Sequence, residues 1–299
     1  MTRLDRIDVR LVQQLIAAQF PQWADLLITP IKFGGHDNRT FHLGEHLLVR
    51  LPSAAAYASQ AEKEYCWLPK LAPLLKIQIP IPLALGKPSD GYPWHWSVYR
   101  WIEGETAAVA DCSDLRQFAR DLAEFLVALQ QIDMTDGPTP GRHNFYRGGS
   151  LANYDTETRQ AIATLAGNID GHAAIEVWNT ALGSLWDKLP VWVHGDVAVE
   201  NMLIKNGRLH AVIDFGCSAV GDPACDLVIA WTLFKGESRD VFRAGLSLDS
   251  ATWARARGWT LWKALIECAK PSNTDDRKFE KLRGMIAELL AEHKRDHGL

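Results

Sequence analysis

The segment 190–216 constrains the fold of this chain more than any other part of the sequence. It opens with a short apolar run, and two further apolar runs within 203–213 are joined by Asn206-Gly207. Asn-Gly supplies the two residues of positive φ that a type I′ turn requires. The segment therefore predicts a strand followed by a tight β-hairpin.

Polar side chains stand at both ends of this predicted hairpin. Asp196 and Asn201 precede its first strand, and Asp214 follows its second strand in the sequence Asp-Phe-Gly. Because the two ends of a hairpin lie together, we expect the three side chains to converge. Phosphoryl transfer uses such a set: one carboxylate accepts the proton of the attacking hydroxyl, while an Asn and an Asp hold Mg²⁺ on the nucleotide phosphates. We expect Asp196 to be the base and Asn201 and Asp214 to be the metal ligands.

The order of these motifs resembles the aminoglycoside phosphotransferase and choline kinase-like family. The resemblance is carried by VHGDVAVENMLIKNGRLHAVIDFG (193–216) and GDPACDL (221–227). His-Gly-Asp stands here where protein kinases have His-Arg-Asp. Gly195 removes the cation that would pair with a phosphorylated activation loop, and few residues separate Asp-Phe-Gly from Gly-Asp-Pro. A protein kinase is therefore disfavoured.

This resemblance implies an α+β, two-lobed, protein-kinase-like fold, with a small antiparallel-sheet N-lobe that holds one inserted helix and a larger, mainly helical C-lobe. We expect a nucleotide-binding lobe over 1–103 that ends in a hinge, and a catalytic and acceptor-binding lobe over 104–299. The hydrophobic patterns of the first lobe predict helices over 8–20 and 57–71 and strands over 28–32, 40–43, 46–51, 77–86 and 92–102. Those of the second predict helices over 114–132, 155–169, 172–188, 223–235, 249–269 and 275–296.

The same resemblance assigns residues of the first lobe to the nucleotide phosphates. Gly34 and Gly35, between two strand-like runs, would let the backbone approach the phosphates closely. Arg50 stands where kinases have a strand lysine, and its planar fork would contact phosphate bidentately. Glu64 is the expected partner of Arg50, with Glu62 as the second choice.

The hinge is expected over 98–106. There, backbone groups of Tyr99, Arg100 and Trp101 would bind the purine edge of ATP or GTP, and the side chains do not show which purine is preferred.

Two further residues are expected to support the loop around Asp196, and a third is expected to cap a helix. The resemblance implies that His194 orients this loop by hydrogen bonding and that a buried Asp226 braces it. Asp222, which directly precedes Pro223, is expected to cap a helix.

Charge and composition exclude several classes of function. The 299 residues include 32 basic and 36 acidic side chains with no long basic block, so a nucleic-acid partner is not expected. The longest apolar run, Ala224 to Phe234, is shorter than the roughly 18 residues of a membrane span, and the N-terminus is charged where a signal peptide is apolar. Five cysteines without a Cys-x-x-Cys pair indicate a reducing compartment. We expect a cytoplasmic protein, a monomer or weak dimer, whose partners are a nucleotide and a small-molecule acceptor.

The resemblance implies a Mg²⁺-dependent phosphotransferase with an alcohol group as acceptor. The γ-phosphate of ATP or GTP would pass to a hydroxyl of an aminoglycoside or related antibiotic, with antibiotic resistance as the implied role. Choline, homoserine, a macrolide or a fructosamine are alternative acceptors. A pseudokinase-like module that binds nucleotide without transfer, and an α+β binding protein without a nucleotide site, are hypotheses from other classes.

Two sets of residues are candidates for the acceptor pocket. A polycationic aminoglycoside needs carboxylates near the base, and the sequence offers Glu200, Glu237, Asp240, Glu267, Asp275 and Asp276. Most of these are expected to be ordinary surface charges. An apolar or choline-like pocket would instead use Trp231, Trp253, Trp259 and Trp262, although their helical spacing favours core packing.

Overall fold

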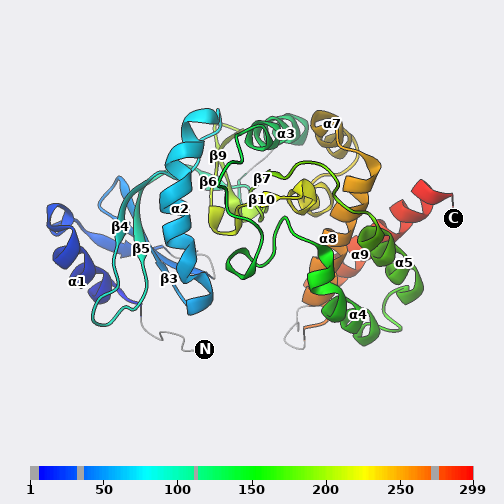
Figure 1. Cartoon of the computed structure of the whole chain (residues 1–299), viewed down its shortest axis with the longest axis horizontal. Coiled ribbons are helices and arrows are strands. Elements are labelled where there is room, and N and C mark those ends of the chain that lie inside the picture. Colours follow the sequence, from blue (N-terminus) through cyan, green and yellow to red (C-terminus); the bar gives the residue numbers. More distant parts are fainter. Residues whose placement is uncertain (1–6, 32–36, 111–113, 271–275, 299) are drawn as a thin grey trace. The chain divides into compact units, whose positions relative to one another are not determined.

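The computed structural model describes residues 7–31, 37–110, 114–270 and 276–298 of the chain (Figure 1). The chain forms two compact units. The first contains Met1–Cys112, Arg142–Phe145 and Glu200–Ser218, and the second contains Ser113–Gly141, Tyr146–Val199 and Ala219–Leu299. The functional division expected at residue 103 stays a prediction.

A five-stranded antiparallel sheet is the centre of the first unit. Its strand order is β1-β2-β3-β5-β4. The strands are β1 (Ile28–Pro30), β2 (Asn38–Leu43), β3 (Leu47–Pro52), β4 (Pro82–Gly86) and β5 (Trp96–Arg100). This sheet, with one helix inserted between β3 and β4, confirms the fold expected for the N-lobe.

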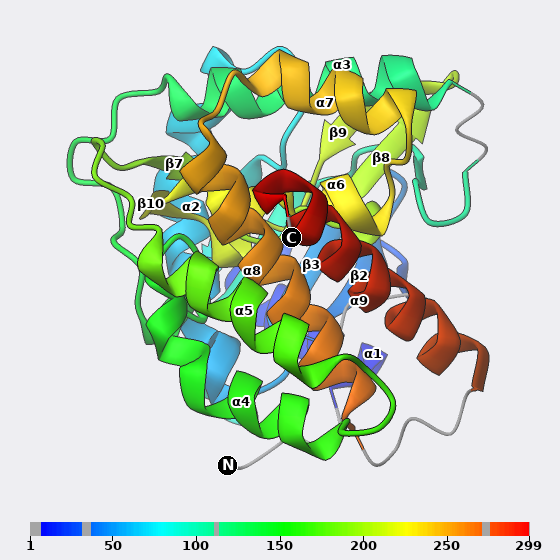
Figure 2. The same ribbon diagram turned by 90° about the vertical axis from the view of Figure 1, so that its right-hand side faces the viewer.

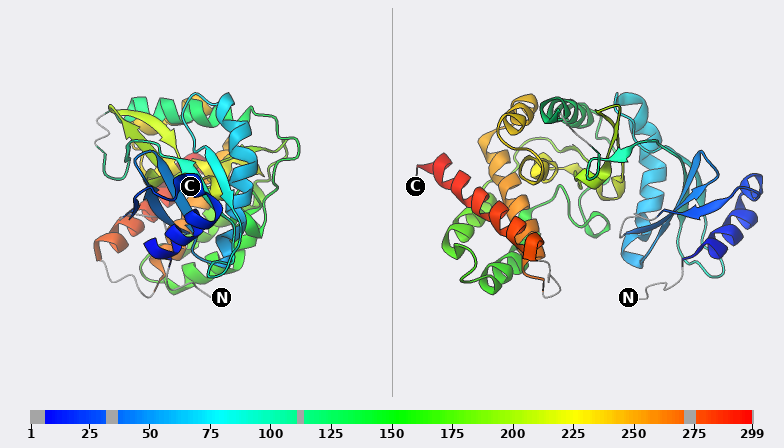
Figure 3. Two further views of the ribbon diagram at one scale, coloured as in Figure 1. Left: turned by 90° about the vertical axis from the view of Figure 1, so that its left-hand side faces the viewer. Right: turned by 180° about the vertical axis from the view of Figure 1, so that it is seen from behind.

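Two helices cover opposite faces of this sheet (Figures 1 and 3). α1 (Val9–Gln19) packs its apolar side against the face that carries Val49 and Leu51 of β3. Successive side chains of a strand point to opposite faces, so Arg50 points to the other face. That face is covered by α2 (Ala58–Leu71), the inserted helix.

A second, three-stranded sheet belongs to the same unit. β8 (Met202–Lys205) and β9 (Arg208–Val212) form the hairpin predicted from Asn206-Gly207, whose φ angles are 53° and 73°. β6 (Glu105–Thr106) pairs with β8. Gln78 exchanges backbone hydrogen bonds with this sheet, since its N–H donates to His210 O and its carbonyl accepts from Val212 N–H. The strand predicted over 77–86 is therefore wrong in its first half, because Gln78 pairs with β9 and β4 begins only at Pro82.

The second unit is mainly helical. Its helices are α3 (Leu115–Gln130), α4 (Asp155–Thr164), α5 (Gly171–Gly183), α6 (Ile229–Thr232), α7 (Glu237–Leu246), α8 (Ser250–Cys268) and α9 (Asp276–His297). Two short strands, β7 (Val191–Val193) and β10 (Ala219–Gly221), pair antiparallel. α8 packs against α4, α5 and α9, and Figure 2 shows it running beside α5 and α9. Within the described ranges, none of the helices has both the length and the apolar character needed to cross a membrane.

The helix predicted over 223–235 is the main correction in this unit. The chain forms a 3₁₀ helix over Pro223–Val228 and then only the short α6. Arg239 donates to the carbonyl oxygens of Ala230 and Phe234, which caps the end of this stretch. Gly236, with a φ of 50°, separates it from α7, a helix that the hydrophobic pattern did not predict.

Candidate functional site

Arg50 is the centre of a charged cluster in the first unit. Its Nη1 lies 3.3 Å from Glu64 Oε2, and its Nη2 lies 2.8 Å from Asp214 Oδ1. Glu64 comes from α2, while Asp214 follows β9 and is 164 residues from Arg50 in the sequence. Burial lowers the pKa of Arg50, but Asp214 and Glu64 outweigh this effect and raise the pKa above its ordinary value. The structure thus brings together three residues that the sequence assigned to the nucleotide and its metal.

Glu64 is held in place by a second partner. The Tyr99 hydroxyl donates a hydrogen bond to Glu64 Oε2, and both side chains are buried. Burial, and after it the charge of Glu64, raises the pKa of Tyr99, so the phenol stays protonated and acts as a donor. Glu62, the second choice as a partner of Arg50, instead faces His95 from an exposed position. The geometry therefore favours Glu64.

A cavity of about 290 Å³ in the first unit collects most of the predicted nucleotide-binding residues. Its walls come from β2, β3, β5, the segment after β5 and the base of the β8–β9 hairpin. They include Arg50, Tyr99, Arg100, Trp101, Asn201 and Asp214. Glu64 is not part of the cavity wall but contacts Arg50, which is. Gly34 and Gly35 lie outside the described residues, so their role as phosphate contacts stays a prediction.

The hinge residues line this cavity with part of their backbone already engaged. Arg100 N–H donates to Ile81 O, and Trp101 N–H donates to His46 O. Any purine contact from these two residues would therefore come from their carbonyl oxygens, and the expected hinge contact stays a prediction.

Asn201 and Asp214 are neighbours at the base of the hairpin. Ile213 N–H donates to Asn201 O over 2.8 Å, and Asp214 follows with a left-handed backbone (φ 65°, ψ 67°). Aspartate tolerates this conformation better than most residues, and such strained positions cluster at functional sites.

These two residues fit one kind of metal site. Mg²⁺ is usually held by one or two carboxylates together with substrate phosphates. In the part of the chain that the structure describes, no three His, Cys, Asp or Glu side chains are grouped to hold a metal. An amide oxygen and a carboxylate on one cavity suit a Mg²⁺ ion whose other ligands are nucleotide phosphates.

The loop after Asp214 is fastened to α2 by a lysine that sequence reasoning missed. Lys63 Nζ donates to Gly216 O over 2.7 Å and to Ser218 O over 2.8 Å. A Cβ on Gly216 would come within 2.7 Å of the amide end of the Gln60 side chain, so any larger residue there would require Gln60 to move. Lys63 directly precedes Glu64, so one turn of α2 positions both Arg50 and the Asp-Phe-Gly loop.

Lys63 makes the stability of this region depend on pH. Burial lowers the pKa of Lys63 to about 8 from an ordinary value of 10.5. Between these values the unfolded chain binds one more proton than the folded chain, so the free energy of unfolding rises with pH. The penalty is fully present below pH 8 and is relieved by pH 10.5, a change on the order of 3 kcal/mol. We expect Lys63→Met to remove this rise in urea unfolding measured from pH 7.5 to 9.5.

The matched control for that measurement is Lys70→Met, because Lys70 is exposed on the same helix. It should keep the wild-type slope of unfolding free energy against pH. Equal slopes for Lys63→Met and wild type would contradict the assignment.

In the second unit, Asp226 braces the loop that carries Asp196. Its two carboxylate oxygens accept the backbone N–H groups of His194, over 2.8 Å, and Gly195, over 2.7 Å. Burial raises the pKa of Asp226, while His194 and the two N–H groups oppose that rise. His194 Nδ1 accepts the backbone N–H of Asp196. The structural roles expected for Asp226 and His194 are confirmed.

Asp222 also has the expected role. Its Oδ1 accepts Ala224 N–H at the start of the 3₁₀ helix, and Arg255 binds the same carboxylate through two nitrogens.

Asp196 itself is paired with Lys263 of α8. Lys263 Nζ lies 2.8 Å from Asp196 Oδ1, and each side chain keeps about a third of its surface exposed. Burial raises the pKa of Asp196, but Lys263, Arg147 and His194 together outweigh it, so the pKa lies below its ordinary value. Neither cation was predicted from the sequence. Asp196 belongs to the second unit, so its convergence with Asn201 and Asp214 stays a prediction.

The residues expected at an acceptor pocket are mostly engaged elsewhere. Glu267 pairs with Lys270 and Lys278, and Glu237 pairs with Arg116 at an exposed position. The other carboxylates are exposed or, for Asp275, outside the described residues, and Glu200 belongs to the first unit. The four tryptophans Trp231, Trp253, Trp259 and Trp262 are all buried, as their helical spacing indicated.

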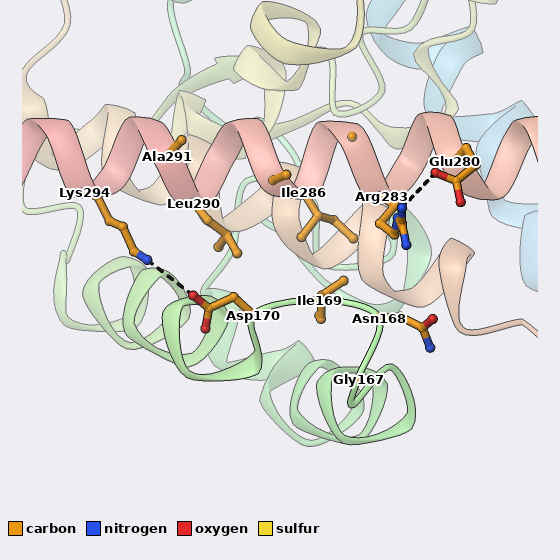
Figure 4. A pocket seen from close by; sticks show the side chains of 12 residues that line it. Gly167, Asn168, Ile169, Asp170, Glu280, Arg283, Ile286, Leu290, Ala291 and Lys294 are labelled. Carbon is orange, nitrogen blue, oxygen red and sulfur yellow. Dashed lines mark hydrogen bonds and ion pairs between the residues drawn. The ribbon is translucent and has the colours of Figure 1, made fainter.

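A separate cavity of about 590 Å³ lies between α9 and the turn that joins α4 to α5 (Figure 4). Its floor is apolar, with Ile286 and Leu290 among its side chains. Its rim carries two ion pairs, Asp170 with Lys294 and Glu280 with Arg283. None of the predicted site residues lines this cavity.

Comparison with known proteins identifies the family. The model of the phosphotransferase enzyme family (APH) matches residues 28–259, which is most of the chain. The chain belongs to this family. This membership confirms the resemblance drawn from residues 193–227 and the enzyme class, a phosphotransferase with an alcohol group as acceptor. No curated protein sequence matches this phosphotransferase.

Several solved structures share the fold of this phosphotransferase. The GDP complex of wild-type aminoglycoside 2'-phosphotransferase-IIIa has a TM-score of 0.68 at 19% identity, over 96% of this chain and 100% of that one. The streptomycin-ATP-APH(2'')-IIa ternary complex has a TM-score of 0.60 at 20% identity, over 96% and 97%. Macrolide 2'-phosphotransferase MphH from Brachybacterium faecium has a TM-score of 0.58 at 19% identity, over 94% and 98%. At these identities the likeness shows the kinase-like fold.

Proposed function

We propose that this phosphotransferase moves the γ-phosphate of ATP or GTP to a hydroxyl of a small molecule. The observation that carries the proposal is the cluster of Arg50, Glu64 and Asp214 on the 290 Å³ cavity that also holds Asn201. Phosphoryl transfer requires a fixed cation at the nucleotide phosphates and ligands for Mg²⁺. Glu64 and Asp214 hold the cation Arg50, and Asp214 together with the Asn201 amide suits Mg²⁺. The solved structures of similar fold include complexes with GDP and with ATP.

Each residue has a distinct role in this proposal. Arg50 would contact the nucleotide phosphates, and Glu64 would keep it in position. Asn201 and Asp214 would hold Mg²⁺, which supplies positive charge for the phosphate oxygens when it is bound. Asp196 would accept the proton of the acceptor hydroxyl, since its lowered pKa keeps it ionised at neutral pH.

Two acceptor classes enter the proposal. An aminoglycoside or related antibiotic, with resistance as the role, is suggested by two enzymes of similar fold, an APH(2'')-IIa that binds streptomycin and a macrolide 2'-phosphotransferase. Another small hydroxylated metabolite is favoured by the surroundings of Asp196, where Lys263 and Arg147 are cationic. We propose a cytoplasmic protein, monomeric or weakly dimeric, that acts on these small molecules without a nucleic-acid or membrane partner.

An acceptor panel tests the function and the acceptor together. Purified protein is incubated with Mg²⁺, with ATP or GTP, and with aminoglycosides, macrolides, choline, homoserine and fructosamines, and products are detected by the mass of an added phosphate. We expect transfer to one acceptor class. Nucleotide binding is measured separately, as a rise in melting temperature on adding ATP or GTP with Mg²⁺.

The two readouts separate the hypotheses. Nucleotide binding with no transfer to any acceptor would favour a binding module without transfer, and no rise in melting temperature would contradict the nucleotide site itself.

A further inference from the structure

Lys263 contacts Asp196, and the charge of Arg147 also acts on this carboxylate. We propose that Lys263 and Arg147 form an anion-binding subsite, so that the acceptor is a hydroxyl compound carrying a carboxylate or phosphate group rather than a polycation. This inference rests on the proposed function, because it concerns the substrate of the same base. All the residues that carry it belong to the second unit.

Lys263 can reach a ligand while it contacts the base. Its ammonium group has three donors, and the contact with Asp196 Oδ1 uses one of them. Its side chain keeps 34% of its surface exposed. An acceptor whose anion binds Lys263 would therefore place its hydroxyl close to the Asp196 carboxylate.

Arg147 contacts the faces of two aromatic rings. Its guanidinium carbon lies 4.6 Å from the ring centre of Trp262 and 5.2 Å from that of Trp259. Tyr154 stacks on Trp262 with ring centres 4.0 Å apart. A stacked guanidinium loses little freedom when it binds a planar anion, which makes Arg147 a preorganised carboxylate or phosphate contact. Its charge already acts on Asp196, whose pKa it helps to lower.

Several acidic groups near this site have partners of their own: Asp222 pairs with Arg255, and Asp226 accepts backbone N–H groups of His194 and Gly195. Glu157 accepts the indole N–H of Trp262 at the outer edge of the aromatic cluster. Glu267, which also lies on α8, pairs with two lysines, and these hydrogen bonds lower its pKa. An anion would be attracted by Lys263 and Arg147 and repelled only by the Asp196 carboxylate, whereas a polycation would be repelled by both cations.

The test compares compounds that share one backbone and differ in charge. Glycerate, glycerol 3-phosphate, glycerol and 3-aminopropane-1,2-diol are tested at millimolar concentration by ligand-observed NMR, with and without a bound ATP analogue and Mg²⁺. We expect the two anions to bind, the neutral and cationic compounds to bind at least 10-fold more weakly, and the anions to stay bound beside the nucleotide. The stronger of the two anions distinguishes a carboxylate from a phosphate.

Variants assign the binding to these side chains. Lys263→Met and Arg147→Met should each weaken anion binding at least 10-fold and leave nucleotide binding unchanged, and Lys263→Arg should restore most of it. Lys270→Met and Arg159→Met are controls with exposed cations elsewhere in the same unit. The proposal is overturned if neither anion binds, if the aminodiol binds equally well, or if the nucleotide displaces the anions. Nucleotide binding itself would be untouched by those outcomes, so the proposed function is judged separately.

Discussion

Asp196→Asn is expected to lower the rate of phosphoryl transfer by about 10²–10⁴-fold, the usual contribution of a general base. The amide has nearly the same shape as the carboxylate but cannot accept the proton of the acceptor hydroxyl. Asp226 holds the loop through backbone N–H groups of His194 and Gly195, so the loop itself should survive the change. The measurement is single-turnover transfer with saturating nucleotide and acceptor.

The control for this variant is Asp187→Asn, which alters an exposed carboxylate of the same unit. It should keep wild-type turnover. Nucleotide affinity, measured as the shift in melting temperature with ATP or GTP and Mg²⁺, should be the same for wild type and Asp196→Asn. Retained turnover in Asp196→Asn would refute the assignment of the base.

Asp214→Asn is expected to have the second largest effect, a loss of about 10²-fold or more in transfer rate, as is typical when one electrostatic contact to the reacting phosphate is removed. The amide keeps a metal-binding oxygen but loses the negative charge that attracts Mg²⁺. It also removes the 2.8 Å ion pair with Arg50. We therefore expect the Mg²⁺ concentration for half-maximal rate to rise in the same variant.

Glu62→Gln provides the matched control, because Glu62 is an exposed carboxylate of the first unit that pairs with His95 and not with Arg50. It should leave both the rate and the Mg²⁺ requirement unchanged. If Asp214→Asn loses turnover with an unchanged Mg²⁺ requirement, Asp214 acts by positioning Arg50 and not by holding the metal.

Much of the secondary structure could be predicted from local patterns. The helices α1, α2, α3, α8 and α9 lie within a few residues of their predicted ranges. The errors fall where a distant partner intervenes. Gln78 leaves the predicted strand because it bonds to β9, and the helix after Pro223 ends early where Arg239 takes its carbonyl oxygens. Patterns of neighbouring residues contain no information about such partners.

The candidate site likewise contains residues that the sequence indicates and residues that it does not. The spacing of the motifs named Asp196, Asn201 and Asp214, and the family resemblance named Arg50 and Glu64, with Glu62 as the second choice for the partner of Arg50. Lys63 and Lys263 had no comparable signal, since a lysine on an amphipathic helix looks like an ordinary solvated charge.

The sequence by itself thus determined the hairpin at residues 202–212 and the ranges of helices such as α3 and α8, and it named the candidate side chains, whose roles stay predictions. The hairpin and these helices depend on backbone conformation and hydrophobic period over a few residues. Only the tertiary structure decided that Arg50 contacts Asp214 across 164 residues, that Lys63 binds the backbone of the Asp-Phe-Gly loop, and that Lys263 pairs with Asp196. Such contacts depend on how helices and strands pack. Packing brings together residues that are far apart in the chain, and the sequence around each residue does not indicate its partner.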